Sequence, residues 1–344
     1  MKSRTSSAVS IKTVAEKAGV STATVSRIMN GQLDKASATT VALVQSVVAN
    51  LGYRPTGAGR TLRSGRSRLV VVLAANMANP AMSAIAASTE IALRNAGYVM
   101  VLCDTHENPA LQDEYLLEMQ AQYAHGWVLL GAVDSPVLRS LSASGERIVF
   151  VNRHAPVTVQ ADIAAQTFVG IDDFAAGGEV ARWMARQDCS NIGLIHAKLE
   201  SSATAGRIAG FKHALQQLHI KLPKTNMLTA SGFEHLEIGY RCMQKLLTRP
   251  KSKNDLLSVF CTSDLIAYGA QRCCAEHGLK TGQDILLVGF DDGPLNPWLA
   301  PWLNSVRVPY ALYGQAIAEA LEASEPSSWI LPHQLITRAP AVAS

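Results

Sequence analysis

Apolar residues between Ser10 and Gly31 recur at the spacing of short helices. In the first block they fall at i, i+3, i+4 and i+7 and form one helical face: Ile11, Val14, Ala15 and Ala18. Gly19 follows where a left-handed C-terminal cap is expected, and the hydroxyl of Ser21 can cap the next helix. The pattern therefore predicts two short helices joined by a tight turn.

The second block has two unlike faces. Val25, Ile28 and Met29 are predicted to point inward. The opposite face carries small side chains and one cation: Thr22, Ala23, Ser26 and Arg27. A helix, a glycine turn and a second helix with a polar outer face form the geometry of a DNA-reading helix-turn-helix, although a small αα-hairpin with a solvated face has the same pattern.

A third helix is predicted from a cap at Ser37 to Leu51, and it closes a helical domain over residues 1–55. Its buried stripe is Val41, Val44, Val48 and Leu51. Residues 56–68 then alternate glycine with arginine and contain one large apolar residue, Leu62. This segment is either a flexible linker or, as its charge favours, a segment that becomes ordered along DNA, with Leu62 wedged into a minor-groove step.

From Leu69 onward the pattern changes to repeated βα units. The run Leu69–Ala74 is apolar throughout, as in a strand buried on both faces of a parallel sheet. Further strands are predicted at Tyr98–Cys103, Trp127–Leu130, Ile148–Val151, Phe168–Ile171, Ile192–His196, Met227–Thr229, Ser258–Cys261 and Ile285–Phe290. Helices are predicted between them, and the pattern begins again at Phe168, which predicts two doubly wound α/β lobes with ligands at the carboxyl ends of the strands.

Charge divides the 344 residues unevenly. Eleven Lys and Arg against two acidic residues precede Leu69, so this part carries +9 and the remainder −5 of the net +4. A basic head on a mildly acidic body is typical of a nucleic-acid-binding module joined to another domain. An anionic membrane is the other possible partner, but the short helices lack the aromatic amphipathic face that such binding needs.

The six cysteines are scattered without a C-x-x-C pair, which predicts reduced thiols and no structural zinc. No cofactor is expected. Residues 1–10 are polar and no apolar run reaches membrane-spanning length, so we expect a cytoplasmic protein without a signal peptide. Neither a G-x-G-x-x-G after the first strand nor a P-loop nor a Ser/His/Asp motif appears, which argues against an enzyme. A secreted solute-binding protein is the third alternative, and the basic head speaks against it.

Several sequence blocks resemble the lac/gal-repressor (LacI/GalR) family of bacterial transcription regulators. At the start they are VAEKAGVSTATVSRIMNG, LGYRP and RTLRSGRS; in the body they are VGIDDFAAGGEVA, GRIAGFKHAL, VFCTSDLIAYGA and ILLVGFDDGP. The resemblance runs from Ile11 to about Ala320. It implies a homodimer on a pseudo-palindromic operator, a hinge helix, and a periplasmic-binding-protein-like core that holds a small-molecule effector, of sugar or sugar-acid type, between its lobes.

The resemblance also implies domain limits. The first lobe is expected at about 69–166 plus 308–326 and the second at about 167–307 plus 327–344, with crossovers near Asp291 and Pro309. No heptad tail follows, so a tetramer-forming coiled coil is not indicated.

Roles in DNA binding follow by position in the family pattern. Base-reading and backbone contacts are implied for Ser21, Thr22, Ala23, Thr24, Ser26, Arg27, Asn30, Arg60, Leu62 and Arg63. Thr56 replaces the usual asparagine, and Gly57 and Gly59 replace larger residues in the hinge. Since each glycine costs a helix about 0.5–1 kcal/mol relative to alanine, we expect the hinge helix to form only on operator DNA.

Roles in effector binding are implied in the same way. Arg207 matches an arginine that holds ligand hydroxyls or a carboxylate, and Asp291 matches the acid that accepts from hydroxyls. The remaining candidates are Asn79, Met82, Asn152, Arg153, Phe233, Ser263, Asp264 and Trp298. Arg153 beside Asn152 favours a sugar acid, whereas Ala81 and Met82 replace the aromatic residues on which a sugar ring usually stacks.

Overall fold

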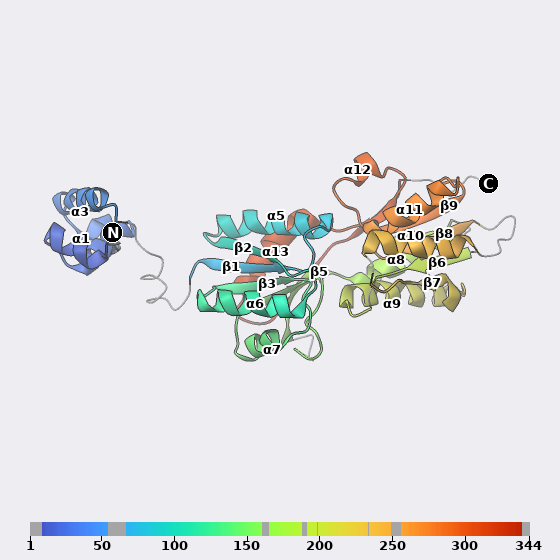
Figure 1. The fold of residues 1–344 in the computed structure, drawn as a ribbon, viewed down its shortest axis with the longest axis horizontal. Helices are drawn as coiled ribbons and strands as arrows, with labels where there is room; N and C mark the ends of the chain where they lie inside the picture. Colours follow the sequence, from blue (N-terminus) through green and yellow to red (C-terminus); the bar gives the residue numbers. More distant parts are fainter. Residues whose placement is uncertain are drawn as a thin grey trace, which may run out of the picture. The chain divides into compact units, whose positions relative to one another are not determined.

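A computed structural model of the protein describes residues 9–53, 67–159, 165–187, 191–197, 199–232, 234–248 and 256–338. The chain forms two compact units, Met1–Ser67 and Arg68–Ser344, and each is described by itself. Most of the predicted linker 56–68 lies outside the described residues. The helical unit and the α/β unit are drawn in Figure 1.

The first unit is helical, as the apolar spacing predicts. Its elements are α1 (Ile11–Ala18), α2 (Thr22–Met29), the 3₁₀ turn η1 (Leu33–Lys35) and α3 (Ala38–Leu51). Each α-helix begins with the same Ser-x-x-Thr cap, in which the serine hydroxyl accepts from the backbone N–H of the threonine: Ser10 from Thr13, Ser21 from Thr24 and Ser37 from Thr40. Gly19 and Gly52 end α1 and α3 in the left-handed conformation, where a side chain would be strained.

The core of this unit is small and aliphatic. Its buried residues are Val14, Ala15, Ala18, Val25, Ile28 and Val44. The predicted stripe of α3 is confirmed in part: Val44 is buried, while Val41, Val48 and Leu51 are half-buried against the same cluster. Both short helices are therefore held by one shared apolar face.

The second unit contains two six-stranded sheets, which form two lobes. The first sheet has the order β11-β5-β4-β3-β1-β2 and is parallel throughout. Its strands are β1 (Leu69–Ala74), β2 (Val99–Asp104), β3 (Gly126–Leu130), β4 (Ile148–Val151), β5 (Thr167–Ile171) and β11 (Ser328–Leu331). The helices of this lobe are α5 (Pro80–Asn95), α6 (Pro109–Ala121), α7 (Pro136–Ala143) and α13 (Tyr310–Glu322).

The second sheet has the order β12-β10-β9-β8-β6-β7. Its strands are β6 (Asn191–Ile195), β7 (Met227–Leu228), β8 (Leu257–Cys261), β9 (Ile285–Asp291), β10 (Asn304–Arg307) and β12 (Gln334–Ile336), of which β12 is antiparallel to β10. Its helices are α8 (Asp173–Ala185), α9 (Ser202–Gln217), α10 (His235–Leu247), α11 (Asp264–Glu276) and the short α12 (Asn296–Leu299), with a 3₁₀ turn η3 (Lys224–Asn226). The two doubly wound lobes confirm the predicted fold class.

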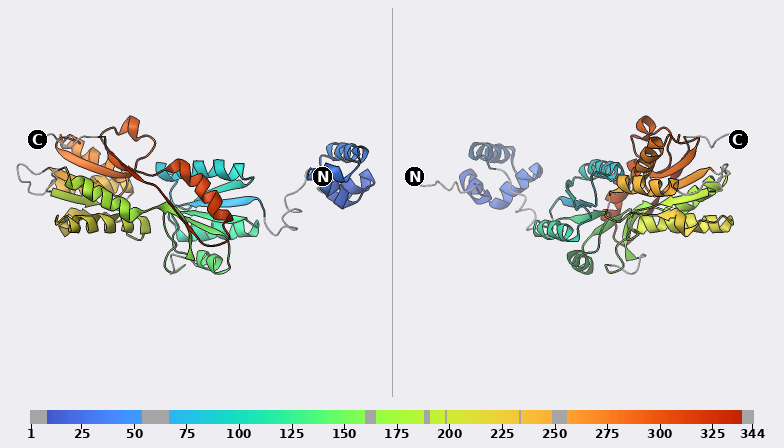
Figure 2. Two further views of the ribbon diagram at one scale, coloured as in Figure 1. Left: turned by 180° about the vertical axis from the view of Figure 1, so that it is seen from behind. Right: turned by 45° about the vertical axis from the view of Figure 1, so that its right-hand side comes forward.

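Both sheets are buried between helical layers, which explains their continuous apolar strands. In β1, Val70 and Val72 pack into the cluster that also holds residues of α5 and α13. The alternate residues Val71 and Leu73 pack with the buried side chains of α6 and α7. Figure 2 shows α13, in red, lying with the blue-to-green elements of the first lobe, although it is near the end of the chain.

The predicted crossover near Pro309 agrees with the structure, because β10 ends in the second sheet at Arg307 and α13 packs in the first lobe from Tyr310. The predicted lobe boundaries differ from the structure at residue 167 and at residue 327, and so does the crossover expected near Asp291. Thr167–Ile171, predicted to open the second lobe, pairs with β4 in the first sheet, so the first crossover follows Ile171. Ser328–Leu331 pairs with β5 and also belongs to the first sheet, whereas Gln334–Ile336 returns to the second. No crossover occurs at Asp291, because β9 and β10 pair in one sheet. A buried apolar strand reads the same in either sheet, so its pairing partner is not visible in the sequence.

Candidate DNA-reading helix and effector site

The outer face of α2 is polar and exposed, as predicted. Ser21, Thr22, Ala23 and Arg27 are exposed, while Val25 and Ile28 are buried beneath them. Ser21 uses its hydroxyl to cap the helix and lies 2.9 Å from the Thr24 hydroxyl. The exposed face of α2 therefore carries one guanidinium and several small side chains, and the Ser21 cap fixes where the helix begins.

Asn30 and Ser26, two further DNA-binding candidates, differ in their exposure to solvent. Asn30 is exposed at its C-terminal end. Ser26 is buried, with 9% exposure, and its hydroxyl accepts from Nδ2 of Asn30 at 3.4 Å. Its predicted place on the outer face is wrong, because the face that packs against the other helices extends over this position. Arg60, Leu62 and Arg63 lie outside the described residues.

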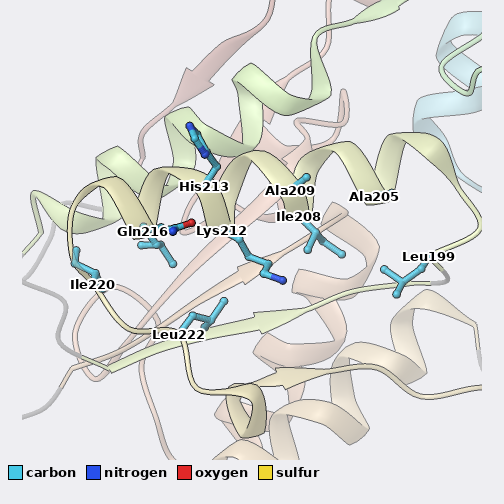
Figure 3. Close-up of a pocket in the computed structure, with 10 residues that line it drawn as sticks. Leu199, Ala205, Ile208, Ala209, Lys212, His213, Gln216, Ile220 and Leu222 are labelled. Carbon is cyan, nitrogen blue, oxygen red and sulfur yellow. The ribbon is translucent and has the colours of Figure 1, made fainter. Parts of the chain in front are cut away.

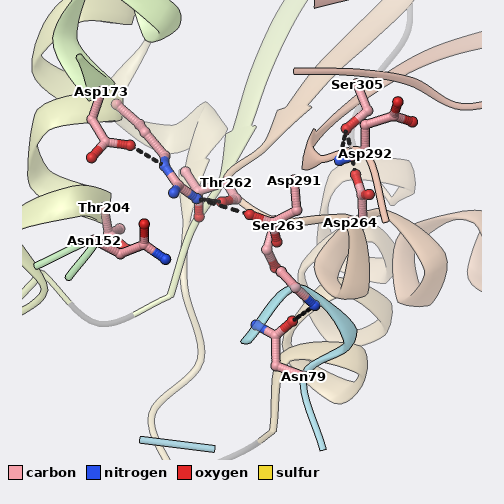
Figure 4. A network of polar contacts seen from close by, with 12 residues as sticks. Asn79, Asn152, Asp173, Thr204, Thr262, Ser263, Asp264, Asp291, Asp292 and Ser305 are labelled. Carbon is pink, nitrogen blue, oxygen red and sulfur yellow. Dashed lines mark hydrogen bonds and ion pairs between the residues drawn. The ribbon is translucent and has the colours of Figure 1, made fainter. Parts of the chain in front are cut away.

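In the second unit a buried arginine lies where the carboxyl ends of the strands meet the starts of the helices. Arg207 lies on α9, and its Nε donates at 2.7 Å to Oδ1 of Asp173, the first residue of α8. Nη1 donates to the carbonyl oxygen of Thr262 at 2.8 Å and lies 3.7 Å from Oδ1 of Asp291. Figure 4 shows this network, with Asn152 and Asn79 of the first lobe drawn beside it. The structure thus brings Arg207 and Asp291 together, as their predicted roles require.

Two carboxylates share this one guanidinium. The side chains of Arg207, Asp173 and Asp291 are only 12%, 13% and 12% exposed. Burial raises the pKa of Asp173 and Asp291, and the Arg207 charge offsets this only in part. Burial alone would lower the pKa of Arg207, but the two carboxylates outweigh it and the pKa is raised. Arg207 is therefore a permanent cation, and its two neighbouring carboxyl groups take up a proton more readily than exposed ones do.

The backbone at Asp291 is strained. Its φ of +113° lies in a region that non-glycine residues rarely adopt. Its carbonyl oxygen accepts from the Tyr310 hydroxyl at 2.6 Å and from the backbone N–H of Val308 at 3.2 Å. The Arg207 guanidinium lies 3.5 Å from the centre of the Phe290 ring. These contacts hold the carboxylate and the guanidinium in one arrangement.

The first lobe contributes Asn152, which follows β4 and has a φ of +61°. The Tyr313 hydroxyl, on α13, donates to its Oδ1 at 2.6 Å. Asn79 is less available, because its Oδ1 accepts from the backbone N–H of Ala81 and caps α5. Met82 and Arg153 both lie against Gly131.

Arg153 is paired within the protein. Its Nη2 donates to Oε1 of Glu107 at 2.6 Å, with side chains 17% and 32% exposed. Glu107 follows β2 and has a φ of +53°. The charge that favoured a sugar acid in the sequence is therefore balanced by a carboxylate of the same lobe.

His235 and Ser263 meet at the start of two helices of the second lobe. Nδ1 of His235 lies 3.1 Å from the Ser263 hydroxyl, which also caps α11. Burial lowers the pKa of His235; the charges that act on it include Glu107 and Arg153 of the first lobe as well as Arg207. The neutral imidazole therefore lies at the junction of the two lobes.

Asp264 has a structural role in place of the predicted one. Its Oδ1 accepts from the Ser305 hydroxyl at 2.6 Å. Its Oδ2 accepts from the backbone N–H of Gly293 at 2.9 Å and from Nδ2 of Asn296 at 2.8 Å. Three protein donors occupy both oxygens, so the carboxylate fixes the loop after β9 and has little capacity left for a ligand.

Of the two predicted aromatic candidates, the structure describes only Trp298. Trp298, on α12, is 81% exposed beside the exposed Leu295 and Leu299. Phe233 lies outside the described residues.

A surface hollow of about 620 Å³ lies along α9, between Leu199 and Leu222, and none of the predicted effector residues lines it (Figure 3).

Sequence reasoning missed Asp173, Glu107 and His235. Asp173 is the second residue of an Asp-Asp pair that directly follows a strand, the same signal that pointed to Asp291. Glu107 follows β2, and only the fold places it beside Arg153. His235 begins α10, and only the fold places it beside Ser263. Their loops carry no distinguishing spacing.

Two classes of feature are absent from the described part of the chain. No group of three or more His, Cys, Asp or Glu side chains is arranged to hold a metal ion. None of the described helices is long and apolar enough to cross a bilayer. Cys103, Cys242, Cys261, Cys273 and Cys274 are free thiols.

Comparisons with known proteins identify the family of both units. Residues 10–56 match the family described as bacterial regulatory proteins, lacI family, and residues 181–339 match the periplasmic binding protein-like domain. The HTH-type transcriptional repressor PurR of Shigella dysenteriae is 30% identical over 342 residues, which cover 95% of each chain.

Two solved structures show the same fold. The lac repressor dimer bound to operator and the anti-inducer ONPF is 23% identical with a TM-score of 0.81, covering 98% of this chain and all of that one. A complex of the transcriptional regulator CelR with cellobiose is 24% identical with a TM-score of 0.70, covering 96% and 99%. The chain therefore belongs to the LacI family of bacterial transcriptional regulators, as a DNA-binding repressor with a periplasmic-binding-protein-like effector domain, and is not an enzyme.

Proposed function

We propose that this repressor reads operator DNA with α2 and responds to a small molecule held between its two lobes. The observation that carries the proposal is the buried Arg207, which is fixed by Asp173 and Thr262 and lies beside Asp291 at the junction of the lobes. A guanidinium and a carboxylate at fixed positions match the donors and acceptors that a hydroxyl-bearing ligand needs.

On DNA, Arg27 is the residue suited to sequence reading. A guanidinium that pairs with both acceptors of a guanine contributes about 1–3 kcal/mol of discrimination. Thr22 and Ala23 lie on the same exposed face and are suited to smaller base contacts, while Ser21, Thr24 and Asn30 are suited to backbone contacts. The basic linker, with Arg60, Leu62 and Arg63, extends the interface into the minor groove.

The effector acts by population shift. A ligand that bridges Asn152 and Arg153 of one lobe to Arg207, Ser263 and Asp291 of the other favours the closed arrangement that it contacts. Because the chain passes between the lobes at three crossovers among the described residues, a change in lobe closure also changes how the first lobe holds the linker. The effector is of sugar or sugar-acid type.

The active form is a homodimer in the bacterial cytoplasm. Two helix-turn-helix units then bind half-sites about 34–36 Å apart, in a pseudo-palindromic operator. Dimerisation doubles the number of base contacts and makes the spacing of the two heads the quantity that the effector controls.

Genomic selection with the full chain tests the proposal. Sheared genomic DNA is bound at modest ionic strength, with and without a pool of small metabolites, and the retained fragments are sequenced. We expect a shared inverted repeat whose occupancy changes with the pool, and a preference relaxed at one base pair of each half-site in Arg27→Ala. An absence of any sequence preference under both conditions would contradict the proposal.

A further inference from the structure

The hollow along α9 has the size of a ligand site and shares no residue with the charged network around Arg207. Its volume is about 620 Å³. Small-molecule sites in proteins usually measure about 300–1,000 Å³. The hollow is therefore large enough to hold a small molecule of its own, apart from the proposed effector.

The floor and one wall of this hollow are apolar. Ile208 and Leu215 of α9 are 7% and 1% exposed and form the floor. Ile220 and Leu222, which follow α9, are half-buried on the wall, and Leu199 at the edge is 57% exposed. A hydrocarbon chain or ring that contacts these side chains leaves water, which favours its binding.

Two alanines keep the helix side of the hollow open. Ala205 and Ala209 lie one turn apart on α9, and both are exposed. Because a methyl group fills little space, the surface of the helix is low at these two positions. A larger side chain at Ala209 would occupy the space that a ligand needs.

The charge at the hollow is positive. Among the described residues that line it, Lys212 is the only lysine or arginine, and none is acidic. Lys212 also forms no ion pair with a described carboxylate. Figure 3 shows its side chain on the side of α9 that faces Leu222. His213 points the other way, toward α8, where its ring centre lies 5.6 Å from that of Phe174.

The chain around the hollow strengthens this positive charge. Residues 201–233 contain no Asp or Glu and carry four cations: Arg207, Lys212, Lys221 and Lys224. Arg207 is buried and paired, so three exposed lysines remain, and Lys221 lies between the lining residues Ile220 and Leu222. Residues 69–344 as a whole carry −5, so this part of the second lobe is a local attractor of anions.

We propose that the hollow is a second small-molecule site, which binds an amphipathic anion: a carboxylate joined to an apolar chain or ring. The apolar part packs on Ile208, Leu215 and Leu222, and the carboxylate pairs with Lys212 at the edge. The apolar floor and wall offer no partners to the hydroxyl groups of a sugar, and a bare inorganic ion gains nothing from them. This site is independent of the proposed effector site.

Octanoate is the probe, added to the full chain at neutral pH and constant ionic strength. Octan-1-ol and octylammonium keep its chain but replace the carboxylate by a neutral or a positive group, and acetate keeps only the carboxylate. Isothermal titration calorimetry measures the affinities. We expect octanoate to bind about fivefold more tightly than octan-1-ol, because a partly solvated ion pair contributes about that factor. Octylammonium should bind more weakly than the alcohol, and acetate should not bind.

Two variants test the two halves of the site. Lys212→Gln is expected to lower the affinity for octanoate about fivefold and to leave that for octan-1-ol unchanged. Its matched control is Lys245→Gln, at an exposed position on α10, which should bind like the wild type. Ala209→Trp fills the hollow and should abolish binding of both compounds, and its melting temperature without ligand shows whether it folds.

The proposal is overturned if octanoate does not bind, or if it binds no more tightly than octan-1-ol or acetate. Unchanged octanoate binding in Lys212→Gln or in a folded Ala209→Trp would place the compound elsewhere and overturn it too. Retention of the chain on anionic phosphatidylglycerol vesicles, without octanoate binding, would assign this surface to a membrane instead. None of these results affects operator preference in the genomic selection, where failure of the proposed function would appear.

Discussion

The Tyr313 hydroxyl donates a hydrogen bond of 2.6 Å to Oδ1 of Asn152, and so joins α13 to the loop after β4. The two residues are separated by most of the second lobe in sequence. Asn152 adopts a left-handed backbone conformation there, and the bond fixes the direction of its amide. A helix near the end of the chain thus orients a side chain that we propose to contact the effector.

Removing this hydroxyl is expected to weaken the first lobe modestly. Tyr313→Phe leaves a partly buried acceptor without its donor, at a cost of about 1 kcal/mol in the free energy of unfolding. Urea unfolding of the full chain measures it, with Tyr123→Phe, at an exposed position, as the control. Equal stability of the two variants would show that the Asn152 bond contributes nothing.

Asp291 makes stability depend on pH. Burial raises its pKa to about 8, from about 3.9 in the unfolded chain, so its contribution is fully present below about pH 4 and is lost as the pH rises toward 8. Asp291→Asn cannot titrate. Its stability relative to the wild type should therefore increase across this window, by up to about 1.4 kcal/mol for each pH unit.

Urea unfolding at pH 5, 6.5 and 8 provides the comparison. Glu114→Gln is the control, because it removes a carboxylate that is exposed. Parallel pH profiles for Asp291→Asn and the wild type would contradict a raised pKa in the folded protein.

Close helix packing in the second lobe depends on glycine. A Cβ at Gly210 on α9 would collide with the carbonyl oxygen of Phe174 on α8, and one at Gly177 would collide with that of Arg207. Gly210→Ala must push the two helices apart, and we expect it to cost about 1–3 kcal/mol of stability. Because Arg207 and Asp173 lie on these helices, effector affinity should fall as well.

Lys212→Ala, on the exposed face of α9, is the matched control and should change stability by less than about 0.5 kcal/mol. Calorimetry of the three proteins compares their unfolding. A Gly210→Ala protein as stable as Lys212→Ala would show that the helices accommodate the methyl group.

Arg27 should contribute base specificity and not stability, because it is exposed on α2. Arg27→Ala is expected to lose about 1–3 kcal/mol of binding to the selected operator and to relax the preference at one base pair. The unfolding transition should be unchanged.

Lys17→Ala, in the last turn of α1, removes an exposed charge without removing a base contact. If it binds phosphate, it should weaken all sequences equally and reduce the salt dependence of binding. Fluorescence anisotropy with operator and scrambled duplexes at two salt concentrations separates the two effects. Equal losses on both duplexes for Arg27→Ala would contradict base reading.

The sequence alone determined the elements that rest on local pattern. The Ser-x-x-Thr caps and the glycine after α1 set the first two helices, and the uninterrupted apolar run set β1 at Leu69–Ala74. Local spacing also predicted the strand that ends at Asp291, whereas the roles of Arg207 and Asp291 came from the resemblance to the lac/gal-repressor family. These signals act over a few residues, so no tertiary contact is needed to detect them.

Only the tertiary structure decided which sheet each strand joins and which charges meet. The apolar pattern of Thr167–Ile171 fits either sheet, and the pairing with β4 assigns it to the first lobe. Asp264 is a candidate ligand residue by sequence, but in the structure its carboxylate accepts from Gly293, Asn296 and Ser305. Arg153 by sequence favours an acidic ligand, but in the structure its charge is balanced by Glu107. Pairing partners and charge balance depend on contacts between residues far apart in the chain, and a local pattern carries no information about them.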